Sequence, residues 1–539
     1  MEKFVYAKRI VATGGDVTGA EALLMKKPLQ IGLAEKNLLV LKGKAYVILD
    51  FGKELAGGAR LLTYSVKGCS KVRLRFGESV SETCAELGEK GACNDHSNRD
   101  FCVNLQYYSD MIFGQSGFRF LRIDTLDEGT EVKLKTVVAA TTIDDREELG
   151  SFECNDPLIN EIWNTAAHTR RLCLQNGYFW DGIKRDRLVW IGDLYPEMRA
   201  AQCLFGSVPE TENSLRFAMD ERPATSWMAG LPSYNLWWLM ILAEEYSSRK
   251  DTEWAAPFLP YAEEILRFLD GFVAEDGNTK FPVDFIDWPS KWVEGEPLEK
   301  KADAAAGSYY LLRKTLEAVE VLPLTERTRA VCEGMKAKLA KHTVKVNSFK
   351  QIAGLGVWAG DRSENNERVL TEGGAKGLST FLSYFILSGV AAYGRRSEAF
   401  SMMKEYYGGM LSVGATSFWE DFDLAWLENA SRIDELPVAG KKDIHGDYGK
   451  FCYKGFRHSF CHGWSAGVIP FLTETVLGVR KTAAGFTQVT ISPDLCGLTF
   501  VKGTVPTPYG LLTVQHTLQA DGSVKTDYTA PKEITVVLQ

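Results

Sequence analysis

Residues 155–167 read NDPLINEIWNTAA, and they mark the point at which the periodicity of the chain changes. Asn155 can cap a helix, and Pro157 fits the first helical turn. The apolar residues that follow recur at helical spacing: Leu158, Ile159, Ile162, Trp163 and Ala166. This stretch therefore predicts the first helix of a region that differs from the part of the chain before it.

The part before this stretch, up to about residue 145, has the period of β-strands. In VRLRFGESV (72–80), apolar residues alternate with arginines, which is typical of a half-buried strand. In GFRFLRID (117–124) the alternation slips by one residue, as a β-bulge would cause. Glycine-rich breaks separate the runs, so an antiparallel β-sandwich is expected. We interpret the polar segment NDHSNRD (94–100) as a solvated hairpin loop rather than as part of a site.

The part after this stretch alternates helical segments with glycine-, proline- and aromatic-rich connections. Helices are expected near 193–205, 209–220, 233–249, 252–274, 301–321, 324–342, 375–393, 396–409 and 460–475. Ten to twelve helices of similar length favour a closed ring of helical hairpins. A solenoid is the alternative, but no fixed-period repeat supports it. From about residue 478 the β pattern returns, and Asp521-Gly522 predicts a tight hairpin there.

Composition excludes several classes of protein. The 539 residues are 45% hydrophobic and carry a net charge of −8, without a basic tract, which argues against nucleic acid and anionic membranes as partners. Eleven scattered cysteines without a CxxC pair predict neither a disulfide framework nor a zinc site. The start lacks the apolar run of a signal peptide, and the apolar stretch 378–393 is too short to span a bilayer. We therefore expect a cytoplasmic protein.

Residues 178–199, YFWDGIKRDRLVWIGDLYPEMR, combine charge with aromatic surface more densely than a solvated face or a packed core would. Acids, an arginine and indole rings on one short stretch suit a pocket that binds sugar hydroxyls and transfers a proton. The alternative is a buried ion-pair network at a helix start, because such networks also perturb acids.

Hydrolysis of a glycosidic bond requires two carboxyl groups, one to protonate the leaving oxygen and one to activate water or attack the sugar. The candidate acid is Asp186, between Arg185 and Arg187. Its best partner is Glu420 in ATSFWEDFD (415–423). Asp421 is adjacent, but neighbouring side chains point in different directions, so only one of the two should face a pocket.

Two further segments repeat the combination of polar and indole groups. HSFCHGWSAG (458–467) places His462 and Trp464 at the expected start of the last long helix, where the histidine either contacts substrate or has a structural role. Asp287-Trp288 and Trp292 lie in another connection. The histidines show no HxH or HExxH spacing, and there is no G-x-G-x-x-G, Walker or G-x-S-x-G motif, so no metal site or cofactor is predicted.

The run DGIKRDRLVWIGD (181–193) resembles the signature of the α-L-rhamnosidases. The resemblance places Asp186 at the family's general-acid position and Glu420, after Trp419 in a G-A-T-x-x-W-E segment, at its general-base position. Other matched positions imply contacts with the sugar: Asp181, Arg185, Trp190, Asp193, Asp287, Trp288 and His462. DFGKELAGG (50–58) and PTPYG (506–510) resemble the family's flanking β domains.

The resemblance implies a central (α/α)6 barrel, residues 148–477, between an N-terminal β-sandwich, residues 1–147, and a small C-terminal β-sheet domain, residues 478–539. It implies an inverting hydrolase that removes terminal α-L-rhamnose, or a related deoxysugar, from oligosaccharides or glycosides. No nucleic acid or membrane partner is expected, and the protein is expected to be a monomer or a homodimer.

Two positions depart from the family pattern. Asp186 stands where Glu is usual, and Gly182 where Cys is usual. The shorter acid moves its carboxyl by roughly 1.5 Å, enough to impair a proton transfer. A sugar-binding protein without catalysis is therefore one alternative. Another is a lyase or phosphorylase on the same barrel: Arg185, Arg187 and His462 are compatible with a lyase, whereas Glu420 argues against a phosphorylase.

Overall fold

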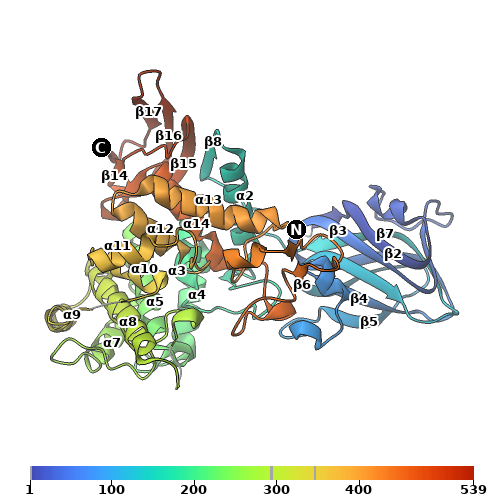
Figure 1. Ribbon diagram of the computed structural model, residues 1–539, viewed down its shortest axis with the longest axis horizontal. Coiled ribbons are helices and arrows are strands. Elements are labelled where there is room, and N and C mark those ends of the chain that lie inside the picture. The colour runs from blue at the N-terminus through green and yellow to red at the C-terminus, as the bar shows by residue number, and fades with distance from the viewer. Residues whose placement is uncertain (1–2, 292–294, 345–346) are drawn as a thin grey trace.

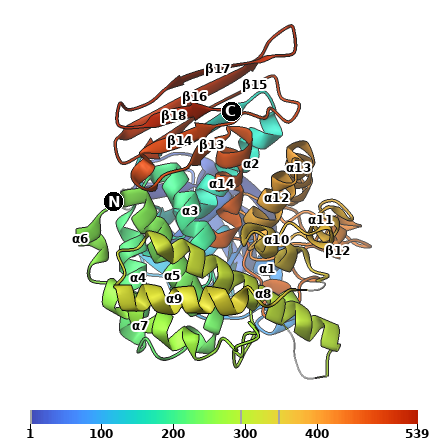
Figure 2. The same cartoon turned by 90° about the vertical axis from the view of Figure 1, so that its left-hand side faces the viewer.

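The structure is a computed structural model that describes residues 3–291, 295–344 and 347–539. It has three regions: an N-terminal antiparallel sheet, a helical body, and two C-terminal sheets that lie over one side of the helices (Figures 1 and 2). Trp292 lies outside the described residues. Within the described ranges, no helix is long and apolar enough to cross a membrane.

The N-terminal region is one antiparallel sheet that folds back over its own core. Its strands run in the order β1-β7-β3-β6-β4-β5, with β2 on β3. Both ends of β3 pair with β7, which bends the sheet around a hydrophobic cluster separate from that of the helices. The elements are β1 Lys3–Tyr6, β2 Arg9–Thr18, β3 Leu39–Lys67, β4 Lys71–Gly77, the short helix α1 Val80–Cys84, β5 Asp100–Asn104, β6 Ser109–Thr125 and β7 Glu131–Thr141.

The irregularity expected near residue 120 exists, but the extra residues belong to the partner strand. Phe118 of β6 pairs with Leu55, whereas Phe120 pairs with Asp50, so β3 holds the insertion. Phe118, Phe120 and Leu121 are all fully buried. A segment buried on both faces cannot show the clean alternation of a half-buried strand, which explains the slip in the sequence pattern.

The helical body is built from α2 to α14. Its helices are α2 Pro157–Leu172, α3 Leu194–Phe205, α4 Pro209–Glu221, α5 Pro232–Arg249, α6 Thr252–Ala255, α7 Leu259–Asp270, α8 Leu298–Ala318, α9 Glu326–Leu339, α10 Lys350–Trp358, α11 Glu364–Thr371, α12 Ser383–Ala392, α13 Arg396–Ser412 and α14 Val468–Phe471. Helices α2, α3, α5, α8, α10, α12 and α14 each contact the next, and α14 contacts α2 again. Helices α4, α9, α11 and α13 each pack against members of this series.

Helices α10 and α11 were not predicted from the sequence. Helix α10 contains Gly354 and Gly356, which lower helix propensity. Its glycine at 354 is needed for packing, because a Cβ atom there would lie 3.0 Å from the backbone nitrogen of Ile386 in α12. Helix α11 has only eight residues and is capped by Ser363. Close packing therefore determines this helix pair more than periodicity does.

The start of α2 differs in detail from the prediction. Asp156, not Asn155, caps the helix by accepting from the backbone N–H of Leu158. Asn155 instead accepts from the backbone N–H of Thr499 in the C-terminal region. The preceding strand β8, Ser151–Cys154, pairs with β15, so these residues belong structurally to a C-terminal sheet.

The C-terminal region contains a three-stranded sheet, β13-β14-β18, and a four-stranded sheet, β17-β16-β15-β8. The bounds are β13 Val479–Lys481, β14 Gln488–Ile491, β15 Phe500–Thr507, β16 Gly510–Leu518, β17 Val524–Thr529 and β18 Thr535–Leu538. The hairpin predicted at Asp521-Gly522 is confirmed, because Gln519 donates to Ser523 across it. The helix predicted from 460 to 475 is present as a continuous helical segment from Gly463 to Val476, but its hydrogen bonding changes along its length: 3-10 from Gly463 to Gly467, then α14, then π from Leu472 to Val476.

Candidate active site

One cavity of about 350 Å³ brings together every site residue expected from the sequence. It lies at the ends of the body helices, where the connecting loops converge. The expected residues that line it are Asp181, Arg185, Asp186, Trp190, Asp193, Asp287, Trp288, Glu420 and His462. These residues come from four separate segments of the chain, so only the tertiary fold assembles them.

The loop between β10 (Tyr178–Phe179) and α3 supplies most of the charged groups. Its base is closed by Asp181, whose backbone N–H donates to Leu188 and whose carboxylate accepts from the N–H of Leu188 at 2.8 Å. Asp186 and Arg187 at its tip both have left-handed backbone conformations, with φ of 56° and 58°. Two consecutive non-glycine residues in this region cost energy and require support from their surroundings.

Asp193 sits at the N-terminus of α3, but its side chain makes no capping hydrogen bond. The carboxyl group is therefore available to the cavity rather than to the helix. The positive end of the helix dipole at this position favours negative charge there. Asp193 is accordingly placed to accept or donate a hydrogen bond to a ligand.

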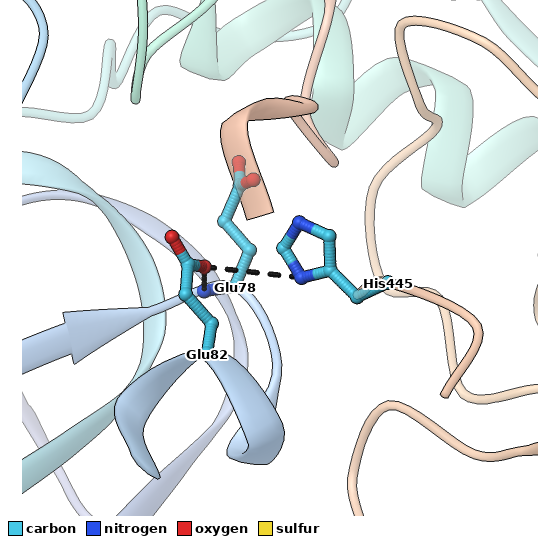
Figure 3. Close-up of side chains that lie close together, drawn as sticks. All are labelled: Glu78, Glu82 and His445. Atoms are coloured by element: carbon cyan, nitrogen blue, oxygen red, sulfur yellow. Dashed lines mark hydrogen bonds and ion pairs between the residues drawn. The ribbon is translucent and has the colours of Figure 1, made fainter. Parts of the chain in front are cut away.

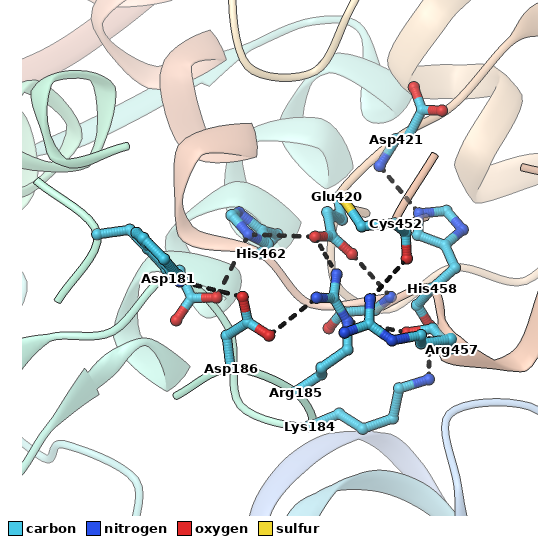
Figure 4. Close-up of polar contacts among 12 residues, drawn as sticks. Asp181, Lys184, Arg185, Asp186, Glu420, Asp421, Cys452, Arg457, His458 and His462 are labelled. Carbon is cyan, nitrogen blue, oxygen red and sulfur yellow. Dashed lines mark hydrogen bonds and ion pairs between the residues drawn. The ribbon is translucent and has the colours of Figure 1, made fainter. Parts of the chain in front are cut away.

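Arg185 bridges the two carboxyl groups that could perform acid–base chemistry. Its Nη1 donates to Oδ1 of Asp186 at 2.9 Å, and its Nη2 donates to Oε1 of Glu420 (Figure 4). Because one planar guanidinium contacts both groups, their nearest oxygens lie within about 8 Å of each other. This bound is compatible with the separation of about 6.5–9.5 Å that leaves room for a water molecule in inverting glycosidases.

Other groups fix the orientation of Glu420. Its Oε2 accepts from the backbone N–H of Ser459, and its own backbone carbonyl accepts from Thr380 and from the indole of Trp464. The adjacent Asp421 lines a second, neighbouring cavity of about 900 Å³. Only one of the two acids faces the candidate site, as the sequence analysis expected.

Three buried acids in the cavity have pKa values above their ordinary range. Burial raises the pKa of Asp181, with the nearby charge of Asp193 adding to the effect. Burial also raises the pKa of Asp193, and Glu197 and Glu420 add to it. Burial next to Asp421 raises the pKa of Asp287 to about 7. Carboxylic acids of this kind can donate hydrogen bonds to sugar oxygens as well as accept them from hydroxyls.

His462 lies at the centre of this group. Its Nε2 is 3.8 Å from Asp181, 4.0 Å from Asp193 and 3.8 Å from Glu420. Burial lowers its pKa well below the ordinary value, and the charge of Arg185 lowers it further. The ring packs against Trp464 with centroids 4.0 Å apart. A neutral imidazole held in this way can bind a hydroxyl group without disturbing the charges around it.

Aromatic rings form the remaining walls. Trp190 packs edge-on against Tyr234, and Trp288 stacks on Phe451 with centroids 6.2 Å apart. Several lining residues were not expected from the sequence: Tyr234, Phe285, Phe381, Cys452, Tyr453 and Arg457. All of them except Phe285 come from segments without an acid–indole pair. The mixture of aromatic and basic residues at 451–457 is the one sequence signal that could have pointed to part of this set.

Lys184, next to Arg185, joins the catalytic loop to the N-terminal region in a buried cluster. Glu78, Glu82 and His445 lie close enough together to hold a metal ion (Figure 3). The ammonium of Lys184 already lies among them, 2.9 Å from Glu78, 3.3 Å from Glu82 and 3.5 Å from His445. Its positive charge pairs with both carboxyl groups, so we interpret the cluster as an ion-pair site.

A helical body with a cavity lined by paired carboxyl groups and indole rings is an arrangement suited to binding carbohydrate. Comparison with known families narrows this interpretation. Residues 147–308 match the bacterial alpha-L-rhamnosidase 6 hairpin glycosidase domain, and residues 478–539 match the bacterial alpha-L-rhamnosidase C-terminal domain. Two parts of the chain therefore match α-L-rhamnosidase domains, the family whose signature its sequence motifs resemble.

Individual relatives and solved structures are also similar to the chain. The chain is 23% identical over 558 residues to an α-L-rhamnosidase from Alteromonas sp. (strain LOR), a match that covers 92% of this chain and 57% of that protein. A GH78 family rhamnosidase of Bacillus sp. GL1 has a similar fold, with a TM-score of 0.73, 19% identity, and coverage of 97% of this chain and 55% of that one. A rhamnosidase from Klebsiella oxytoca with rhamnose bound has a similar fold, with a TM-score of 0.66, 18% identity, and coverage of 88% of this chain and 95% of that one. The chain thus spans little more than half the length of the first two relatives.

Proposed function

We propose that this protein is an inverting glycoside hydrolase that removes terminal α-L-rhamnose, or a related deoxysugar, from oligosaccharides or glycosides. The observation that carries the proposal is the bridge of Arg185 between Asp186 and Glu420 in a cavity lined by three further acids and three indoles. The names of the relatives give the sugar. The helix contacts that return from α14 to α2 support an (α/α)6 barrel over 148–477, flanked by β domains at 1–147 and 478–539.

In the proposed mechanism, Asp186 protonates the glycosidic oxygen while Glu420 takes a proton from water. The water oxygen attacks the anomeric carbon as the bond to the leaving group breaks, so the configuration inverts. Arg185 contacts both carboxyl groups and so holds them facing the same cavity. Asp181, Asp193, Asp287 and His462 would hold the sugar hydroxyls.

Proton NMR tests this function directly. An aryl α-L-rhamnoside should release free rhamnose whose β anomer appears first and then mutarotates. Appearance of the α anomer first would exclude the inverting mechanism. Absence of rhamnose release, with sugar binding retained, would favour a sugar-binding protein.

The lyase alternative has a separate test. A lyase would raise the absorbance of an unsaturated product when it acts on uronate polymers, and we expect no such rise. We further propose, from the sequence analysis, a cytoplasmic monomer or homodimer. Sedimentation analysis measures the oligomeric state.

A further inference from the structure

The segment 94–100 lies in the connection between β4 and β5 and is exposed at Asp95, His96 and Asn98, as its polar sequence indicated, but it also contacts the loop that carries the candidate acid. Three consecutive residues contact the catalytic region. Asp95 accepts from Arg457 at 3.0 Å, and Ser97 donates to the backbone carbonyl of Lys184 at 2.8 Å. Between them, Nδ1 of His96 lies 2.8 Å from the backbone nitrogen and 3.0 Å from Oδ1 of Asp186.

We propose that His96, supplied by the N-terminal β region, is a positioning residue for the proton donor Asp186. This inference rests on the proposed function. It deepens that function by assigning part of the acid machinery to a domain outside the helical body.

The first reason is backbone geometry. Asp186 and Arg187 form a left-handed turn that their surroundings must hold in place. His96 accepts the backbone N–H of Asp186 within this turn. His96 therefore helps to fix the backbone position of Asp186. Because aspartate is one methylene shorter than glutamate, the position of its carboxyl group depends more closely on the position of its backbone.

The second reason is the chemistry of a single ring nitrogen with two contacts. Nδ1 lies within hydrogen-bond distance of both the backbone nitrogen and the carboxyl oxygen Oδ1 of Asp186. One ring atom therefore contacts both the backbone and the carboxyl group of the candidate acid. The other charged groups around the pair are Arg185, which contacts the same oxygen, and the ion pair of Asp95 with Arg457.

The third reason is that the side chain of His96 is more exposed than that of Asp186. The side chain of His96 is 42% exposed, whereas that of Asp186 is 18% exposed. Substitution of His96 should therefore leave the folded core intact, so a change in activity would report on Asp186. The opposite oxygen of Asp186 accepts from the indole of Trp190 at 3.0 Å, which completes the support of the carboxyl group.

The test compares two substrates whose leaving groups need different amounts of protonation. For His96→Ala, kcat on methyl α-L-rhamnoside should fall about tenfold or more, since general acids contribute about 10²–10⁴-fold. On 4-nitrophenyl α-L-rhamnoside it should fall less than about threefold, with KM nearly unchanged on both. Equal losses on the two substrates, or no loss on either, would overturn the proposal.

Ser97→Ala is the matched control, because it weakens the anchoring of the same loop without touching Asp186. It should not discriminate between the two substrates. If it shows the same selective loss as His96→Ala, the position of the loop and not the ring of His96 is responsible, and the proposal fails.

A measurement without substrate separates this inference from the proposed function. In the full chain, the imidazole ¹⁵N shifts of His96 should change when Asp186 is replaced by asparagine, because an amide group then replaces the carboxyl group beside Nδ1. Unchanged shifts would refute the pairing. If the shifts change but the wild-type protein cleaves neither rhamnoside, the proposed function is wrong while the contact between His96 and Asp186 stands.

Discussion

Replacement of Lys184 by methionine should destabilise the protein strongly, because it leaves two buried carboxylates without their counter-charge. The side chains of Glu78 and Glu82 are 0% and 1% exposed, and Lys184 contacts both. Removal of one partner from a buried ion pair costs about 3–5 kcal/mol. For a cooperative unit of some 150–250 residues this corresponds to a Tm lower by roughly 6–20 °C, which differential scanning calorimetry can measure.

The effect of Lys184→Met should depend on pH in a defined direction. Burial, only partly offset by Lys184, raises the pKa of Glu78 from 4.5 to about 7. A carboxyl whose pKa is raised by folding contributes stability that is fully present below its unfolded value, about 4.5, and lost as the pH rises through 7. Without Lys184 the pKa rises further and more stability is lost. The destabilisation should therefore be larger at pH 8 than at pH 5.

Two variants make this prediction specific. Lys525→Met removes a lysine from an exposed pair with Asp527 and should cost less than about 1 kcal/mol. Lys184→Met combined with Glu78→Gln should recover part of the lost Tm, because it removes a buried charge that has no partner. A Lys184→Met protein with a wild-type Tm at pH 8 would refute the interpretation of the cluster as a charge-compensated ion-pair site.

Three further substitutions test other parts of the structure. Glu420→Gln should lower turnover by about 10²–10⁴ without changing the far-UV circular dichroism, and near-normal turnover would remove Glu420 from the mechanism. Asp193→Asn should mainly raise KM for rhamnosides, since the residue is placed to bind the sugar; unaltered KM and turnover would make its role structural. Gly354→Ala should lower the free energy of unfolding by about 1–3 kcal/mol, since the new Cβ would lie 3.0 Å from the backbone of α12; a stability equal to wild type in urea would show that the helices separate without cost.

The sequence predicts the arrangement of regions well, because periodicity and turn residues are local properties. Helices α3, α4 and α5 begin and end within one or two residues of their expected positions. Helix α10 was missed for a physical reason: its glycines allow close approach to α12, and that contact cannot be seen in a local window. The cap of α2 was assigned to the wrong one of two adjacent capping residues, because Asn155 is engaged by a strand more than 340 positions away.

Sequence motifs predicted the residues that line the candidate site. They did not predict the residues that hold the site in place. All nine expected residues line one cavity, and each lies in a segment that combines an acid or a histidine with an indole. The sequence did not predict a role for His96 or Glu78, because their segments resemble an ordinary polar loop and an ordinary strand end. Their roles depend on how the N-terminal region packs against the loop 181–188, which no spacing in either segment encodes.

The pairing of β8 with β15 has a consequence for the time course of synthesis. Cys154 of β8 finds its partner in Val501, about 350 residues later in the chain, so at about 5–20 residues per second β8 waits roughly 20–70 s for it. During this interval the strand has an unpaired edge next to the first helix of the body. The nascent chain therefore passes through a long-lived stage in which the helices have emerged but the sheet that ties their two ends together has not, and chaperone binding would matter most at that stage.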